Sequence, residues 1–263
     1  MARGGGGSND DFGRFGDNQA ILPTFYCERT ALGLCLKARH NDFINDIEIY
    51  GAMRPSGFIF MFLVALAYVI SAAVYESLPE SIATHWGGGG QPDGYSPKHV
   101  ALSIIPATMA FYALLFSLIP RFVAKKEYLH LFALYFDRFL FTLLLFLLGI
   151  HIFIISWAMG YRMDVAMVIS ALMAPLYYSI GHMLENLDPA WSKRKKYAWP
   201  QFDDKTSKKV QEQIAQGFKL AGIAMLMGAF LPQYAMWVII IANVAVCVWL
   251  FAVLAKEFLA ARI

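Results

Sequence analysis

The chain has 263 residues, of which 58% are hydrophobic and 16% are charged. Soluble domains have roughly 45–50% apolar and about 25% charged residues, so both values are shifted toward a membrane protein. The net charge of +3 is too small to indicate nucleic-acid binding, and the three cysteines lack the spacing of a disulfide framework. Composition therefore argues against a soluble enzyme and against a nucleic-acid partner, and indicates a chain whose main partner is the lipid bilayer.

The first element in chain order is a mixed, polar segment over residues 1–54. Residues 1–19 contain GGGGS and a run of polar residues. This composition cannot bury a core, so we predict that this part is disordered. Two apolar patches follow, and we predict short helices on the inner membrane face there. The spacing of Cys27, Cys35 and His40 fits zinc sites poorly, so we predict no metal in this segment.

Residues 55–263 contain apolar runs of the length that a membrane requires, about 20 residues for a helix. The six stretches are Gly57–Leu78, His99–Ile119, Leu129–Met159, Val165–Met183, Gly217–Leu231 and Ala235–Phe258. Backbone groups in lipid must be paired within their own segment, so these runs must be helices. We therefore predict an all-α fold, a polytopic bundle of about six transmembrane helices. Only LPQY separates the last two spans, which predicts a tight helical hairpin.

The distribution of lysine and arginine predicts the orientation of these spans. Basic residues gather before the first span, after the second, in loop 184–216 and after the sixth, whereas the other loops are poor in them. By the positive-inside rule, both termini are cytoplasmic, loop 79–98 faces outward and the protein resides in the cell membrane. Loop 184–216 also predicts a short amphipathic helix, DKTSKKVQEQIAQGF, ahead of the fifth span.

The outward loop 79–98 contains strong turn signals. Residues 87–90 are four consecutive glycines, which allow the chain to reverse. The segment Gln91–Gly94 contains proline and Asp-Gly, which predict a turn. Together these features bring His85 and Asp93 near each other.

Two interpretations of this pair remain open. His85 and Asp93 could ligate a metal with help from Glu76 or Glu80, but the irregular spacing is a weak metal signal. The alternative is a hydrogen-bonded loop histidine beside an Asx-turn aspartate. We favour the second interpretation and predict no metal.

The order of residues in this loop resembles the signature of SdpI-type membrane proteins. The pattern is Leu-Pro-x-x-Ile-x-x-His-Trp, a glycine-containing turn, and Pro-Asp-Gly-Tyr-x-x-Lys. The matching positions are Leu78, Pro79, Ile82, His85, Trp86, Pro92, Asp93, Gly94, Tyr95 and Lys98, with Pro106 in the next span. The likeness covers roughly residues 55–160. The family's Asn-x-x-Gly is replaced by glycines here, and the Arg-Thr pair of its cytoplasmic motif is missing.

The resemblance implies a non-enzymatic immunity protein or signal receptor. The founding member of that family protects a toxin-producing bacterium against its own secreted peptide and holds a transcription repressor at the membrane. The resemblance makes loop 79–98 the recognition element for a peptide on the outer face. Its candidate residues are His85, Trp86, Asp93, Tyr95 and Lys98. The sequence contains no Ser-His-Asp, Walker or dinucleotide pattern, so we predict neither an enzyme nor a cofactor.

Four polar residues inside the spans are candidates for function, because ionisable groups are costly there. Asp137 and Arg138 are consecutive, so they point to different faces and each needs its own partner. His151 can join a proton path, pair with Asn243 or bond to a neighbouring helix in its neutral form. Asn243 is predicted to bond across helices, a contact worth about 0.6 kcal/mol.

Three functions therefore remain open. The leading one is the receptor or immunity protein with loop 79–98 as its recognition element. The second is an accessory subunit of a larger membrane complex. The third is a small transporter or ion pathway that uses Asp137, His151 and Asn243, although no internal repeat supports it.

Overall fold

A computed structural model gives the architecture of the protein. The description covers residues 55–123, 129–187 and 204–260. These residues belong to one compact unit, Met53–Ile263. The N-terminal segment 1–54, with its cysteines and His40, lies outside the described residues, and so does 188–203 of the basic loop. The predictions for these segments stay predictions.

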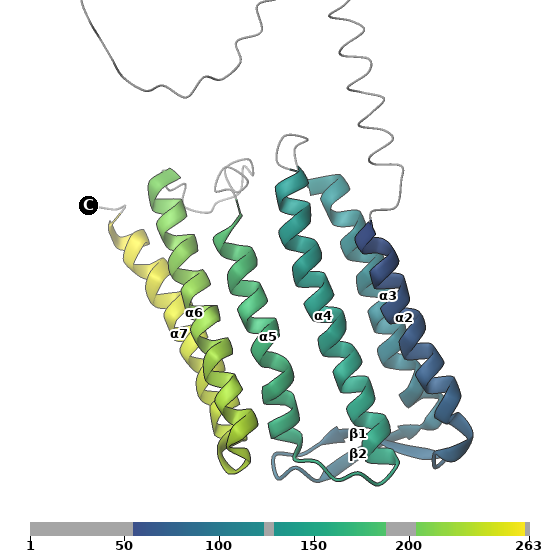
Figure 1. Ribbon diagram of the computed structural model, residues 1–263. Helices are drawn as coiled ribbons and strands as arrows, with labels where there is room; N and C mark the ends of the chain where they lie inside the picture. Colours follow the sequence, from purple (N-terminus) through teal and green to yellow (C-terminus); the bar gives the residue numbers. More distant parts are fainter. Residues whose placement is uncertain (1–54, 124–128, 188–203, 261–263) are drawn as a thin grey trace, which may run out of the picture. The chain divides into compact units, whose positions relative to one another are not determined.

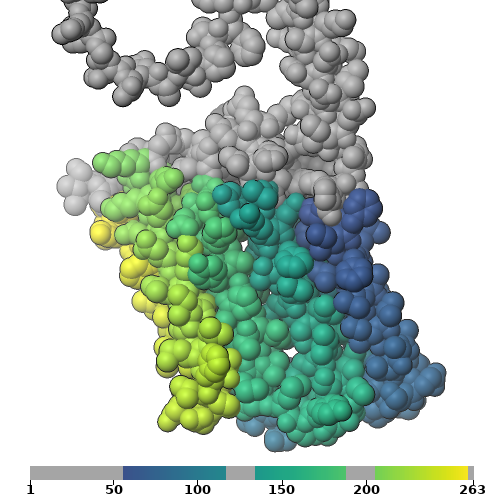
Figure 2. Space-filling view, in the orientation of Figure 1, coloured from purple at the N-terminus to yellow at the C-terminus, as the bar shows by residue number. Residues whose placement is uncertain are grey.

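Six α-helices of the described residues run alternately up and down, side by side (Figure 1). They are α2 Pro55–Val74, α3 Lys98–Val123, α4 Leu129–Ala158, α5 Val165–Glu185, α6 Asp204–Phe230 and α7 Ala235–Ala260. Helices α2, α3 and α4 contact one another, and so do α5, α6 and α7. Contact between α4 and α5 joins the two groups. Figure 2 shows the two groups side by side, from the blue atoms of α2 at one edge to the yellow atoms of α7 at the other.

Five helices of the described residues are long and apolar enough to cross a membrane. Their spans are Ser56–Ser77, Lys98–Phe116, Leu134–Ala158, Val165–Glu185 and Pro232–Leu259. Large apolar side chains point outward from them, for example Phe62 and Phe251, which are 64% and 75% exposed. Such surfaces are stable in lipid and not in water. The protein is therefore an integral membrane protein.

Helix α6 is not among these five spans, and it also differs from the prediction. We expected a short amphipathic helix over 204–218 followed by a separate span, whereas α6 is one helix over Asp204–Phe230. Gly217 lies within this helix, and α7 packs closely against it there. A Cβ atom at Gly217 would lie 2.6 Å from the Trp249 Cδ1 atom. The prediction of a sixth crossing therefore depends on α6.

A β-hairpin at one end of the bundle corrects the all-α prediction (Figure 1). Strands β1, Ser81–Trp86, and β2, Pro92–Pro97, pair antiparallel. The predicted turn at Gln91–Gly94 is wrong, because the glycines before it already reverse the chain. The Gly87 amide donates to the Gln91 carbonyl, and the Gly90 amide donates to the Gly87 carbonyl, both at 2.9 Å. The residues after this turn are therefore free to extend as a strand.

Helices α5 and α6 approach each other closely at two glycines. A Cβ atom at Gly181 would lie 2.6 Å from the Ala215 carbonyl oxygen, and one at Gly222 would lie 2.7 Å from that of Ala174. Small residues at such contacts let helix backbones approach in a membrane. These positions therefore have no room for a side chain unless the helices separate.

We expect Gly222→Val to destabilise the protein by about 1–3 kcal/mol, because overpacking forces the backbones apart. The measurement is the midpoint of thermal unfolding in a mild detergent. Ile223→Val, on the exposed face of the same helix, is the matched control and should change the midpoint little. An equal effect of the two substitutions would show that this close contact does not stabilise the protein.

Candidate functional site

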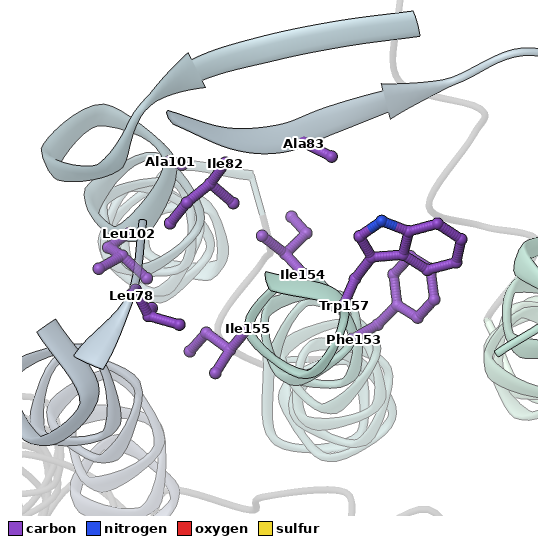
Figure 3. Packing of buried hydrophobic residues seen from close by; sticks show 9 residues of the cluster. All are labelled: Leu78, Ile82, Ala83, Ala101, Leu102, Phe153, Ile154, Ile155 and Trp157. Carbon is purple, nitrogen blue, oxygen red and sulfur yellow. The ribbon is translucent and has the colours of Figure 1, made fainter. Parts of the chain in front are cut away.

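Strand β1 is anchored to the ends of two helices by its inward side chains. Figure 3 shows Ile82 near Leu102 of α3 and Ile154 of α4. Ile82 is 1% exposed, and the neighbouring Ala83 is buried in the same cluster. Burial of one large aliphatic side chain contributes about 1.5–3 kcal/mol. The strand is therefore fixed on the bundle and is not a free loop.

Trp86 extends this anchor at the far end of β1. Its ring centroid lies 5.0 Å from that of Phe153 and 5.6 Å from that of Trp157, both on α4. The second pair is edge-to-face, a preferred geometry of aromatic rings. The buried indole nitrogen has no hydrogen-bond partner among the described residues. The sequence prediction assigned Trp86 to recognition, whereas the structure places its ring against α4.

Lys98 closes the base of the hairpin. Its ammonium lies 2.9 Å from the Glu80 carboxylate and 4.6 Å from the ring centroid of Tyr75. Its backbone amide also donates to the Glu80 carbonyl at 2.9 Å. Lys98 is buried, so this predicted recognition residue holds the two strands together where they leave the helices.

His85 and Asp93 come together on the outer part of the hairpin, which confirms the predicted proximity. The His85 Nδ1 atom lies 2.5 Å from the Asp93 Oδ1 atom, and the two side chains are 73% and 54% exposed. Gly94 lies opposite His85 in the ladder, where a Cβ atom would be 2.8 Å from the His85 Cβ atom. No group of three or more metal-ligating side chains occurs in the described part of the chain.

A groove of about 460 Å³ lies between the hairpin and the end of α4. Its lining is Pro79, Ser81, Ile82, Ala83, Gln91, Pro92, Tyr95, Trp157, Ala158 and Arg162. Tyr95 is exposed and is the lining residue that the sequence also placed in the recognition set. His85 and Asp93 lie outside this lining.

Sequence reasoning missed Arg162, which lies in one of the loops that are poor in basic residues. The Arg162 guanidinium donates to the Trp157 carbonyl at 3.2 Å and lies 4.7 Å from the Trp157 ring centroid. The side chain is exposed, and a guanidinium has five donors in a planar fork. It can therefore bind a carboxylate in the groove while it remains stacked on the ring. The sequence signal that could have identified Arg162 was its position directly after a span.

Inside the bundle, His151 bonds to Ser71 and not to Asn243. His151 is fully buried, and its Nε2 atom lies 2.8 Å from the Ser71 hydroxyl. That hydroxyl also lies 3.0 Å from the carbonyls of Ala67 and Leu102. When the single hydroxyl proton points to a carbonyl, the histidine Nε2–H donates to the serine. His151 therefore joins α4 to α2 and, through Ser71, to α3.

The other three predicted intramembrane residues have separate partners. Asn243 accepts a hydrogen bond from the Tyr177 hydroxyl, across α7 and α5. Asp137 accepts one from the Ser56 hydroxyl at 2.7 Å, across α4 and α2. The Arg138 guanidinium lies 5.7 Å from the Tyr135 ring centroid on its own helix. The structure therefore does not bring the four predicted intramembrane residues together.

Comparison with protein families matches residues 62–110 to a domain of unknown function (DUF1648). The matched stretch contains most of α2, the hairpin and the first half of α3. Searches of curated proteins and of solved structures gave no match. The comparisons therefore single out the hairpin and the two helices that lead into and out of it.

We expect Trp86→Ala to loosen the hairpin, because it removes the ring packed on Phe153 and Trp157. Amide hydrogen exchange in β1 and β2 should accelerate at least about tenfold, which corresponds to about 1.4 kcal/mol. Trp86→Phe should exchange almost as slowly as the unchanged protein, since the indole N–H has no described partner to lose. Unchanged exchange in Trp86→Ala would show that the anchor lies elsewhere.

Proposed function

We propose that this protein is a non-enzymatic membrane receptor of the SdpI type that binds a peptide at the anchored hairpin. The observation that carries the proposal is the groove between the hairpin and α4. One wall belongs to a strand that is fixed by buried side chains, and the other ends in a cationic side chain. Such a preformed site binds a ligand at low ordering cost.

The chemistry of the groove favours a peptide with an apolar side chain and a carboxylate. Tyr95 and Trp157 provide aromatic surface, and Arg162 provides donors for a carboxylate. The His85–Asp93 pair lies on the exposed part of the same hairpin and adds polar contacts beside the groove. The resemblance over residues 55–160 includes this hairpin, which supports the assignment.

We also propose six crossings of the cell membrane, with both termini cytoplasmic and the hairpin outside. Helix α5 starts at the hairpin end of the bundle and α7 starts at that same end (Figure 1). The chain must return between them, and α6 covers that length beside both helices. The apolar part of α6 then crosses the hydrocarbon, and its first turns, which carry Lys205, Lys208 and Lys209, extend to the cytoplasmic surface.

Labelling of introduced cysteines tests this orientation. In a background with Cys27, Cys35 and Cys247 replaced by serine, Gly89→Cys should react with a membrane-impermeant maleimide on intact cells. The Gly89 position is open, because a Cβ atom there would have no neighbour within 4 Å. The control, Lys208→Cys, should react only after the membrane is permeabilised. The reverse pattern would invert the proposed topology.

Photo-crosslinking in living cells tests the receptor assignment. A photoreactive phenylalanine analogue at Tyr95 should capture a discrete secreted peptide, and Arg162→Gln should weaken this capture roughly tenfold, as loss of a charge-assisted bond predicts. The same analogue at Tyr161 is the control, because Tyr161 is equally exposed but outside the groove lining.

Equal adducts from both positions would contradict the proposed site. Capture of an integral membrane polypeptide in fixed stoichiometry, also recovered by co-purification from native membranes, would instead support an accessory subunit. In that outcome the groove would be a subunit contact and the receptor assignment would be wrong.

A further inference from the structure

A second groove, lined by apolar and small side chains, lies between α6 and α7, which are neighbours at one edge of the bundle (Figure 1). Its volume is about 490 Å³. Small residues of both helices line it, among them Gly217, Ala221 and Ala224 of α6 and Ala242 and Ala245 of α7. A bilayer surrounds these helices, so the groove must be filled by an apolar group.

The lining of the groove favours one kind of occupant. The groove follows α6 from Gly217 to Leu231, a rise of about 20 Å. Small glycine and alanine residues form its floor, and the other lining residues are apolar or aromatic. The acyl chains of the surrounding bilayer are flexible enough to follow such a floor. A single hydrocarbon chain therefore suits the groove.

The length of the groove also fits a lipid tail. One leaflet of the hydrocarbon core is about 15 Å thick, half of about 30 Å. A groove of about 20 Å is therefore longer than one tail, which occupies the part of the groove nearer Gly217. Trp249 lies at one end, where its indole nitrogen donates to the Gln213 carbonyl at 2.8 Å. Tryptophan favours the level of the lipid headgroups, so we take this end, on the proposed cytoplasmic side, as the mouth.

Charged side chains lie just beyond this mouth. The Lys209 ammonium on α6 lies 2.8 Å from the Glu257 carboxylate on α7. Lys256 is exposed and lies about two turns beyond Trp249, on the same face of α7. These three side chains together carry a net charge of +1. The other charged residues at the start of α6 are two lysines and two carboxylates, whose charges cancel. The single negative charge of one phosphodiester would balance this net positive charge.

We propose that this groove binds one anionic glycerophospholipid of the surrounding bilayer. One acyl chain lies along the glycine and alanine floor between α6 and α7. The phosphate lies near Lys256 and Lys209, and the glycerol backbone lies beside Trp249. The bound lipid fills the surface between the two helices and fixes α7 to α6 at the proposed cytoplasmic side.

Native mass spectrometry of the full chain tests the proposal. The protein is released from nanodiscs that contain equal amounts of phosphatidylglycerol and phosphatidylcholine. We expect one retained phosphatidylglycerol per chain. Ala224→Phe and, on the other helix, Ala245→Phe each fill the groove and should reduce retention at least tenfold. The controls Ile223→Phe and Val244→Phe change exposed neighbours outside the lining and should leave it unchanged.

A separate variant tests the contact with the lipid headgroup. Lys256→Gln should reduce the preference for phosphatidylglycerol over phosphatidylcholine about five-fold, since one basic residue near the surface contributes a factor of this size. The thermal midpoint of each variant in detergent verifies that it is folded. If one groove variant does not fold, the other on the facing helix still decides.

Two results would overturn the proposal. The first is equal retention of phosphatidylglycerol in Ala224→Phe or Ala245→Phe and in its control. The second is a dimer, detected by light scattering, that the groove variants convert to a monomer without loss of lipid, because a second copy would then occupy this face. Equal retention of the two lipids by the unchanged protein would show that the proposed contact between the phosphate and the lysines is wrong.

Discussion

Hydrocarbon offers no hydrogen-bond partner to a backbone amide, so each segment that crosses it must pair its polar groups internally. This constraint makes the apolar runs helices and places other backbone conformations at their ends. The hairpin obeys it, because a two-stranded sheet leaves one edge of each strand unpaired and needs water there. Its position at one end of the bundle (Figure 1) satisfies those edges and puts the groove where a ligand can reach it.

Packing in the bundle depends on close contacts, because lipid tails are as apolar as the helices and provide no hydrophobic drive for helix association. Helices α5 and α6 meet backbone to backbone at Gly181 and Gly222. Elsewhere, hydrogen bonds join the helices, as between Ser71 and His151 or Tyr177 and Asn243. These pairs lie in separate parts of the bundle. They therefore resemble structural links more than the continuous relay that an ion pathway needs.

The two grooves differ in chemistry as their surroundings require. The groove at the hairpin has aromatic, polar and cationic lining residues, which suits a ligand that arrives from water. The groove between α6 and α7 has small and apolar lining residues, which suits a tail that is already in lipid. They involve different helices: α4 carries one wall of the first groove, and α6 and α7 form the second. The proposed receptor and the proposed lipid site can therefore be tested independently.

The sequence alone predicts the membrane class, five of the spans and the proximity of His85 to Asp93, because hydropathy and glycine turns act over short stretches of chain. It did not determine that Pro92–Pro97 is a strand or that α6 is one continuous helix. Nor did it show that Trp86 faces α4, that Arg162 borders a groove or that His151 pairs with Ser71. These features come from the packing of one element on another, because the local sequence pattern does not identify which elements become neighbours.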